Sequence, residues 1–500
     1  MNKKTHKNIY TTNNNRKSRK IGGKSISSGS YGCVFRPSLT CENADSNKAD
    51  DIKKGNFISK LMYNDEDFDT EKQVMDNLNK ILGELPDINK KHFLVSNTTT
   101  CTPSKFNDEE LVDFNNVCDI FSDKNINESN INSNLDKLKI INMPDGGIEV
   151  ATQIKNIIEI NESEIEKKYK SFIKLNNSLI TLLSNGIIPI NKLNLNHYDI
   201  KGNNMLINDD GIVRLIDWGL AIQNDGKNIP DDLKKSIFQF NTLFSNLFFN
   251  KDLTSMIPDE YKKIKASELL YNEQSGQTKL LKIVAVNLLN NLMHNNNDGH
   301  FNVIKDILHK IYKIYAIENG YNKLDYDILI ENTIIDYITA VLIKFVDSNG
   351  IFKEDKYFFE VYQKNTDILG FLTVYIRFIE KGIDYSQTIP KKEHSQIYRM
   401  DKDIINGICR IIIQYCYSTT YAIKEININK LIKELKSLNK IAESIIKKST
   451  NTTSIPINIY NSDVKHNNSK HNNSKHNKSI KFGFSKRNSV IDDNKFGFSL

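Results

Sequence analysis

The stretch His197-Tyr-Asp-Ile-Lys-Gly-Asn-Asn204 constrains this chain more than any other, because Arg214-Leu-Ile-Asp-Trp-Gly-Leu-Ala221 follows it at a short interval. Between them lie two short apolar runs joined by Asn-Asp-Asp-Gly, a pattern that predicts a β-hairpin. The two runs are Met205–Ile207 and Val213–Ile216. A hairpin brings its two ends together, so we expect Asn204 and Asp217 to lie side by side at one end of a small sheet.

The spacing of these residues resembles the eukaryotic protein kinase family, whose catalytic loop reads His-x-Asp-x-Lys-x-x-Asn before an Asp-Phe-Gly-type motif. The resemblance implies that Asp199 accepts or orients the substrate hydroxyl proton, while Lys201 offsets the charge of the transferred phosphate. It also implies that Asn204 and Asp217 hold Mg²⁺ together with the phosphates of ATP, because Mg²⁺ prefers hard oxygen ligands. The second stretch is especially similar to the casein kinase II branch, where Trp also replaces Phe, and only that substitution is carried over.

A glycine-containing stretch near the N-terminus, Ser27-Ser-Gly-Ser-Tyr-Gly-Cys-Val34, resembles the Gly-rich loop of that family, with a serine in place of the first glycine. Its glycines would let backbone amides approach the phosphates, and its final valine would pack on the adenine. The residues implied to bind ATP here are Ser27, Gly29, Ser30, Gly32 and Val34. The missing first glycine leaves the closure of this loop over ATP open.

A lysine strand and an acidic helix follow in the order that the resemblance requires. Phe57-Ile-Ser-Lys60 fits the strand that carries the ATP-phosphate lysine, although a lysine in an apolar strand is more often an edge residue. Apolar residues at spacings of four and three predict a helix over Asp69–Leu82. Glu71 at its start fits the ion-pair partner of Lys60, with Glu66 as the alternative.

A turn at Met143-Pro-Asp-Gly-Gly147 resembles the hinge whose backbone bonds the adenine edge, although such a turn needs no function. Met143 is therefore included among the residues implied to bind ATP. It ends a predicted strand, Leu138–Met143, in which Ile140 is the candidate gatekeeper. Further on, Glu164–Asn185 predicts an amphipathic helix that Gly186 stops.

Three departures from the family pattern lie around and after the catalytic loop. Tyr198 stands where many kinases carry an arginine that binds an activation-segment phosphate, so we expect activity without such a phosphate. No Ala-Pro-Glu follows Gly219 at the usual distance. The bracing helix aspartate is also displaced: Asn365-Thr-Asp-Ile-Leu-Gly370 resembles it, with Asp367 as the aspartate, but could equally be a helix N-cap.

The expected fold class is α+β, a bilobal protein-kinase-like fold with a small β-rich N-lobe and a larger, mostly helical C-lobe. The expected divisions are a basic tail (1–24), an N-lobe with loop insertions (25–142), a C-lobe (143–450) with a helical insertion (222–350), and a basic low-complexity tail (451–500). Residues 83–135 are expected to be largely loop. The Asn/Ile/Lys-rich composition and long inserts resemble the divergent kinases of large DNA viruses.

The net charge of +7 is concentrated at the two ends of the chain. Residues 1–24 carry +8 and residues 451–500 carry +5, which leaves −6 for the middle. We therefore expect basic protein substrates, and contact with nucleic acid only through the tails. The C-terminal tail also holds His-Asn-Asn-Ser-Lys repeats, which invite a metal interpretation, and two Lys-Phe-Gly-Phe-Ser repeats, a docking motif or low-complexity drift.

The six cysteines show no metal-like spacing, which favours an intracellular, cytoplasmic protein with scattered reduced thiols over a disulfide framework. The first residues resemble no secretory signal, and no apolar stretch is long enough to span a membrane, so membrane insertion is not expected.

The function predicted from these patterns is transfer of phosphate from Mg²⁺-ATP to serine or threonine in proteins. Lys201 favours serine and threonine, because tyrosine kinases usually place a different basic residue further along this loop. Two alternatives stay open. One is a pseudokinase scaffold, and the other is a small-molecule phosphotransferase of the aminoglycoside or choline kinase type, which generally lacks this lysine.

Overall fold

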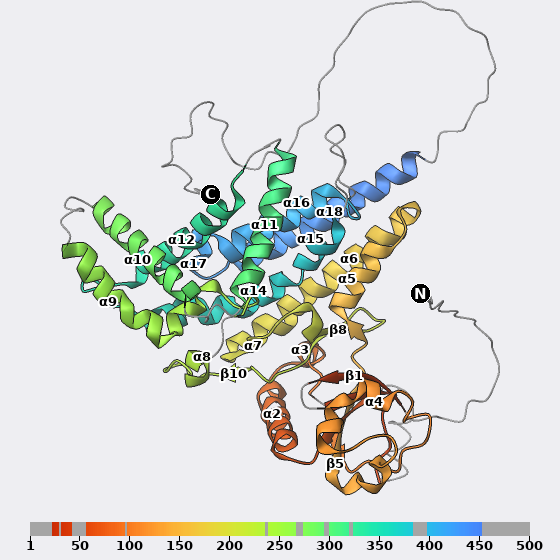
Figure 1. The fold of residues 1–500 in the computed structure, drawn as a ribbon. Helices are drawn as coiled ribbons and strands as arrows, with labels where there is room; N and C mark the ends of the chain where they lie inside the picture. The colour runs from red at the N-terminus through yellow and green to blue at the C-terminus, as the bar shows by residue number, and fades with distance from the viewer. Residues whose placement is uncertain are drawn as a thin grey trace, which may run out of the picture.

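The computed structural model describes residues 23–29, 32–42, 57–95, 98–235, 239–266, 274–294, 300–319, 324–383 and 398–452. It combines a small β-sheet part with a larger, mostly helical part, so the α+β class is confirmed at this level. Figure 1 shows the sheet part at one end of the molecule and the helical part forming the bulk. Ser30, the histidine repeats and the Lys-Phe-Gly-Phe-Ser repeats lie outside the described residues.

The sheet has five antiparallel strands in the order β1-β2-β3-β5-β4. They are β1 Lys24–Gly29, β2 Gly32–Arg36, β3 Phe57–Tyr63, β4 Thr99–Cys101 and β5 Leu138–Pro144. The strands predicted from apolar runs are all present. Strand β4 was not predicted, because it has only three residues and lies in a polar stretch.

One face of the sheet packs on helix α2 (Glu66–Gly83), which begins three residues earlier than its apolar spacing predicts. Phe68 of α2 packs on Met62 of β3 and Ile141 of β5, which lie on the same face because strand side chains alternate. Asp65 caps the helix by accepting a hydrogen bond from the backbone amide of Asp67. The helix therefore has a fixed position against the strand that carries Lys60.

The other face is covered by the segment between β4 and β5. This segment is not plain loop, because it contains the short helical elements α4 Phe114–Val117, η1 Asp119–Lys124, η2 Ile131–Ser133 and η3 Leu135–Lys137. Phe114, Phe121 and Ile131 from this segment pack on Phe35 and Leu61, which lie on the face of the sheet opposite to α2. A polar stretch thus adds a second small apolar core.

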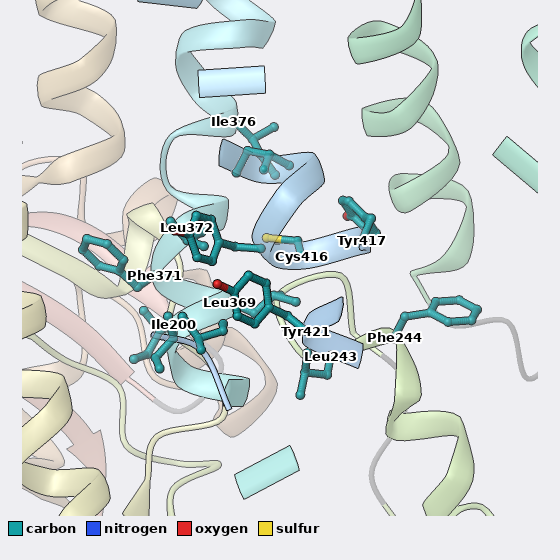
Figure 2. Close-up of a cluster of buried hydrophobic side chains, with 14 of the residues drawn as sticks. Ile200, Leu243, Phe244, Leu369, Phe371, Leu372, Ile376, Cys416, Tyr417 and Tyr421 are labelled. Carbon is teal, nitrogen blue, oxygen red and sulfur yellow. The ribbon is translucent and has the colours of Figure 1, made fainter. Parts of the chain in front are cut away.

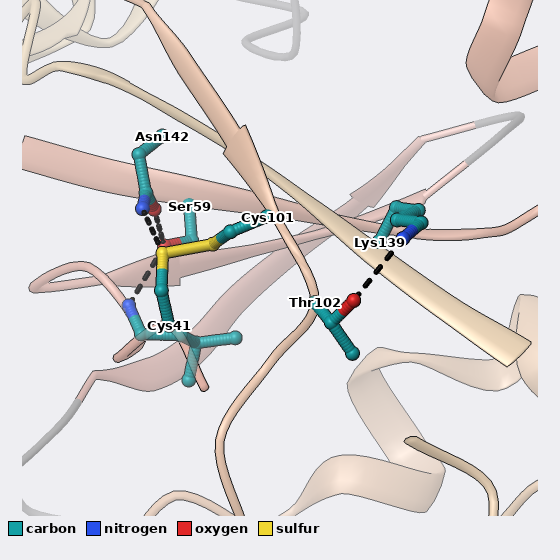
Figure 3. Close-up of a disulfide and its surroundings, with 7 residues drawn as sticks. Cys41, Ser59, Cys101, Thr102, Lys139 and Asn142 are labelled. Carbon is teal, nitrogen blue, oxygen red and sulfur yellow. Dashed lines mark hydrogen bonds between the residues drawn. A yellow bond between two sulfur atoms is a disulfide. The ribbon is translucent and has the colours of Figure 1, made fainter. Parts of the chain in front are cut away.

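Two disulfides join this covering segment and β4 to β2 and the loop after it, so the expectation of scattered reduced thiols was wrong. Cys33 pairs with Cys118 and Cys41 with Cys101, at Cα separations of 5.3 and 5.7 Å. Figure 3 shows the second, beside Ser59 and Asn142. Spacing gave no sign of them, because the partners lie 85 and 60 residues apart.

The helical part begins with β6 and α5, and its long helices α6 and α18 pack side by side (Figure 1). Its first elements are β6 Ile148–Glu149, α5 Val150–Glu159, η4 Glu162–Glu164, α6 Ile165–Leu182, η5 Leu183–Ile187 and α7 Ile188–Lys192. Gly186 does not stop the helix as predicted, because the chain continues through the π-helical turn η5 into α7. A Cβ at Gly186 would lie 3.2 Å from His92 Cβ, so this glycine serves close packing.

The predicted hairpin after the stretch His197–Asn204 is present and is preceded by a short strand and turn. The elements are β7 Leu195–Asn196, η6 Gly202–Asn204, β8 Met205–Ile207 and β9 Val213–Leu215. Strand β6 adds to β8, which gives a three-stranded sheet β6-β8-β9.

The described residues between 222 and 350 are mostly helical, as predicted, except that they open with strand β10 (Ile222–Gln223), which pairs with β7. The helical elements of this region are α8 Asp231–Lys235, η7 Phe244–Phe249, α9 Lys251–Ala266, α10 Gln274–His294, α11 Phe301–Glu318 and α12 Tyr326–Phe345. Their buried side chains belong to the same apolar cluster as those of α6 and α18. These helices therefore share a core with the rest of the helical part.

The remaining elements complete that core. They are α13 Glu354–Tyr357, η8 Phe358–Tyr362, α14 Gln363–Thr373, α15 Ile376–Gly382, α16 Lys402–Ile412, η9 Ile413–Tyr417, α17 Thr419–Ala422 and α18 Ile428–Thr452. Cys409 and Cys416 are free and buried here, and burial raises the pKa of both thiols. Among the described helices, none has the length and apolar character needed to cross a membrane.

The disulfides predict that reduction destabilises the protein. Each closes a long loop, and chain entropy gives an upper limit of about 4–5 kcal/mol for each crosslink. We expect a clear fall in Tm with dithiothreitol, and the same fall without reductant in a Cys33→Ala, Cys41→Ala variant. Cys416→Ala is the control and should keep the response to reductant. Thiol titration of the unreduced, denatured protein should give two thiols, and a count of six would contradict the pairing.

Candidate functional site

The ends of the β8–β9 hairpin bring the predicted metal-binding residues together. Met205 pairs with Leu215, and beyond this pair the Ile216 backbone amide donates to the Asn204 carbonyl over 3.1 Å. Asp217 therefore follows directly on a residue bonded to Asn204. Asp217 is exposed, its backbone has a φ of +62°, and its carboxylate accepts no hydrogen bond and forms no ion pair within the described part of the chain.

The Asp199 carboxylate is buried, with its residue only 6% exposed, and both of its oxygens accept hydrogen bonds. Lys201 Nζ lies 3.0 Å from Oδ1 and 2.9 Å from Oδ2. Asn204 Nδ2 donates to Oδ2 over 2.7 Å and to the Asp199 carbonyl over 2.9 Å. The three residues predicted as catalytic are thus in direct contact with one another.

His197 lies behind Asp199 and holds the loop against the hairpin. Its Nδ1 accepts from the Asp199 backbone amide at 3.3 Å, so Nε2 carries the proton and donates to the Ile216 carbonyl at 3.0 Å. Complete burial lowers the pKa of His197, which favours this neutral ring. The ring also lies 4.6 Å from the Trp218 ring, centroid to centroid. The histidine therefore connects the two sequence motifs.

Asp367 braces the loop from helix α14, as one of the two sequence interpretations predicted. Its Oδ2 accepts from the His197 backbone amide at 2.9 Å, and its Oδ1 accepts from the Tyr198 backbone amide at 3.0 Å. Oδ2 also accepts from the side chains of Asn191 and Asn196. Asp367 is buried inside α14, which continues the helical elements α13 and η8 without a break, so the N-cap alternative is wrong.

Lys60 forms an ion pair with Glu71 of helix α2, and the alternative partner Glu66 is not used. Val34 lies opposite Lys60 in the register of β2 and β3, so the two side chains share one face of the sheet. Gly32 is required for the close approach of these strands, because a Cβ there would lie 2.5 Å from the Leu61 carbonyl oxygen. Ser27 and Gly29 belong to the exposed strand β1, which precedes β2 and pairs with it.

The segment that joins the sheet to the helical part is the one predicted as the hinge. Met143 lies near the end of β5, and Gly147 adopts a φ of +97°, which favours glycine. Arg36 of β2 donates to Asp145 Oδ1 and to the Gly147 carbonyl, both at 2.7 Å. Sequence reasoning missed this link, because Arg36 and Asp145 lie 109 residues apart.

Ile140, the candidate gatekeeper, does not lie on the face of the sheet that carries Lys60. Ile140 faces the disulfide-bearing side of the sheet, where it packs with Leu61. Ile141 is paired with Lys60 across the two strands, and it therefore shares the face of the lysine, as does Met143 two residues on. Successive side chains of a strand point to opposite faces of the sheet. An error of one residue therefore places the predicted side chain on the wrong face.

Sequence reasoning also missed Asn241, which follows α8 and reaches Asp199. Its Nδ2 donates to Asp199 Oδ1 over 2.8 Å. No motif surrounds Asn241 in the sequence, so only the tertiary structure identifies it.

The described residues contain no group of three or more His, Cys, Asp or Glu arranged to hold a metal ion. Asn204 and Asp217 fit Mg²⁺ as a pair of oxygen ligands only if other oxygens, such as those of a nucleotide, complete the shell.

The bracing role of Asp367 predicts a large loss of stability on a nearly isosteric change. Asp367→Asn replaces one acceptor oxygen with a donor and leaves buried amides of the loop unpaired. We expect the free energy of unfolding to fall by about 2–4 kcal/mol, measured by urea denaturation. Asp259→Asn, on an exposed turn of α9, is the matched control and should change it by at most about 0.5 kcal/mol. Equal losses in the two variants would contradict the bracing role.

Two buried histidines predict loss of stability in mild acid. Burial lowers the pKa of His92, and the nearby charges of Lys91 and Arg214 lower it further. The unfolded chain therefore binds protons below about pH 6.5 where folded His92 and His197 do not, and stability falls as pH decreases from there. Replacing His92 by Asn keeps a donor for the Val213 carbonyl and removes the titration. Between pH 6.5 and 5, we expect the free energy of unfolding of the variant to fall less steeply with decreasing pH, by up to about 1.4 kcal/mol per pH unit. An unchanged pH dependence would contradict this assignment.

Comparison with known proteins gives this chain no relative from which a function could be transferred. No family model matches the sequence, and no curated protein matches it either. The function must therefore be argued from the arrangement of the residues themselves. The site just described is a buried carboxylate with a lysine beside it, on a loop braced by a second carboxylate and followed by an exposed aspartate.

Proposed function

We propose that the protein is a serine/threonine protein kinase that transfers the γ-phosphate of ATP to a protein hydroxyl group. The observation that carries this proposal is the arrangement around Asp199, where Lys201 and Asn204 bond the carboxylate and the hairpin places Asp217 next to Asn204. A second supporting observation is the ion pair between Lys60 and Glu71 on the sheet part. The proposed fold is accordingly the bilobal one of protein kinases.

The proposed roles follow from the chemistry of each side chain. Asp199 accepts the proton of the substrate hydroxyl as the oxygen attacks the γ-phosphate. Lys201 is 35% exposed on its side chain and long enough to turn from Asp199 towards the transferred phosphate. Lys60, fixed by Glu71, neutralises the other phosphates of the nucleotide.

The residues proposed to hold Mg²⁺ are Asn204 and Asp217. The Asn204 amide nitrogen is committed to Asp199, which leaves its carbonyl oxygen as the ligand atom, and the Asp217 carboxylate is free within the described residues. Bound Mg²⁺ would supply charge neutralisation between the phosphates.

The surroundings of Tyr198 support activity without a phosphate on the activation segment. Tyr198 is buried and its ring stacks on Tyr362 at a centroid distance of 6.3 Å. Burial raises the pKa of its hydroxyl far above the usual value, so the side chain is neutral. It offers no positive charge to a phosphate at this position.

The proposed substrate class follows from the distribution of charge. The acidic middle of the chain favours basic protein substrates, while any contact with nucleic acid is assigned to the basic tails. The cytoplasmic location expected from the cysteine spacing loses that support, because the two disulfides persist mainly in oxidising environments.

Transfer of labelled γ-phosphate from Mg²⁺-ATP to a generic basic protein tests the proposed function. We expect transfer by the wild-type protein, and a loss of about 10²- to 10⁴-fold for Asp199→Asn, because the proton acceptor is removed. Asp209→Asn is the matched control, since Asp209 lies exposed in the turn of the neighbouring hairpin, and it should transfer at the wild-type rate.

The alternatives give different results in the same assay. Trp218, the only tryptophan of the chain, reports nucleotide binding by its fluorescence. Quenching by Mg²⁺-ATP without transfer to protein, aminoglycoside or choline would support the pseudokinase and contradict the proposal. Transfer only to a small molecule would support the small-molecule phosphotransferase.

A further inference from the structure

Asn241 lies outside both sequence motifs, yet its side chain contacts the proposed proton acceptor directly. It is 1% exposed and follows α8, 42 residues after Asp199. Its Nδ2 donates to Asp199 Oδ1 over 2.8 Å and to the Ile200 carbonyl over 3.3 Å. We propose that Asn241 is a positioning residue that fixes the orientation of the Asp199 carboxylate during phosphate transfer, an inference that rests on the proposed function.

Asn241 and Asn204 form a symmetric clamp on Asp199, the asparagine clamp. Each uses one amide hydrogen on a carboxylate oxygen, Asn241 on Oδ1 and Asn204 on Oδ2. Each uses the other hydrogen on a backbone carbonyl of the same loop, at Ile200 and Asp199 respectively. The two clamp residues therefore fix both the rotation of the carboxylate and its distance from the loop.

The clamp matters because the carboxylate has no vacant lone pair while Lys201 is bound. A carboxylate offers about four acceptor positions, and Lys201 contacts both oxygens in addition to the two asparagines. A substrate hydroxyl can bind only when one of these donors leaves. Lys201 is the partly exposed, flexible donor, whereas Asn204 and Asn241 are buried. When Lys201 turns to the phosphate, the clamp alone keeps Asp199 in place.

The side-chain oxygen of Asn241 indicates that this residue does not serve packing alone. Its carbonyl oxygen Oδ1 is buried without a hydrogen-bond partner in the described structure. The opposite orientation would set this oxygen against the Asp199 carboxylate, so the unpaired group is a direct consequence of donating to Asp199. A buried unpaired acceptor is costly, and a leucine of similar size would avoid that cost.

The backbone around Asn241 is held firmly enough for a positioning role. A Cβ at Gly370 of α14 would lie 3.0 Å from the Asn241 carbonyl oxygen and 2.8 Å from that of Ile200, so both segments rest on this glycine. Leu243 and Phe244 follow in the buried cluster with Ile200, shown in Figure 2. The segment that carries Asn241 is therefore packed on the same helix that braces the catalytic loop.

Asn241→Leu tests the proposal, because it removes the donor together with the unpaired oxygen. We expect kcat to fall about 10²-fold, the effect of a misplaced reacting group, with KM for ATP and the quenching of Trp218 by Mg²⁺-ATP within twofold. We expect Tm to change little, because removal of the buried unpaired oxygen offsets the loss of the hydrogen bonds to Asp199 and to the Ile200 carbonyl. A residue that only supports the fold would give the reverse result, a lower Tm with unchanged kcat per folded molecule.

Asn246→Leu is the matched control, since Asn246 is also buried in this segment but bonds Tyr362 through its Oδ1. It should lower Tm and leave kcat within about threefold, as for a site removed from the reacting atoms. A wild-type kcat in Asn241→Leu would overturn the role of Asn241 and leave the kinase function intact. Absence of transfer by the wild-type protein would overturn both.

Discussion

The rest of the site depends on the carboxylate of Asp367, which is buried beneath the loop that carries Asp199. It accepts the backbone amides of two consecutive residues, His197 and Tyr198. Tyr198 has a φ of +59°, a conformation that costs a non-glycine residue about 1–3 kcal/mol and persists only where its surroundings enforce it. Asp367 provides that enforcement, and the turn at Tyr198 in turn directs Asp199 and Lys201 towards the hairpin.

Two further parts of the chain reach this loop. Ile216 of the hairpin bonds Asn204 and accepts from the neutral ring of His197, and Asn241 bonds Asp199 from the segment after α8. Each of these contacts fixes a different atom of the loop. The helical region after β10 therefore contributes to the site itself, through the segment that carries Asn241.

The sheet part is stabilised by means that the sequence did not reveal. The polar segment between β4 and β5 covers one face of the sheet with a few aromatic side chains, and two disulfides attach it. The opposite face carries Lys60, which Glu71 of α2 fixes. Because each face has its own cover, the lysine face stays free of the covering segment.

Sequence reasoning was most successful where the relevant residues are close together in the chain. The hairpin that joins Asn204 to Ile216 and the pair of Lys60 with Glu71, 11 residues apart, depend on short separations that local patterns specify. The prediction for Ile140 failed because an apolar run does not specify strand register to one residue. The prediction that Gly186 ends a helix failed because packing against His92, and not helix termination, requires a glycine there.

The sequence by itself determined the local chemistry of this protein: which carboxylate, lysine and asparagine stand together, and which strands and helices carry them. Only the tertiary structure decided the partners that come from far away, namely Asp367, Asn241, Arg36 with Asp145, and the two disulfides. The physical reason is that short-range spacing fixes secondary structure and neighbouring side chains. Contacts over 42 to 170 residues depend instead on how the apolar faces pack, which no local pattern records.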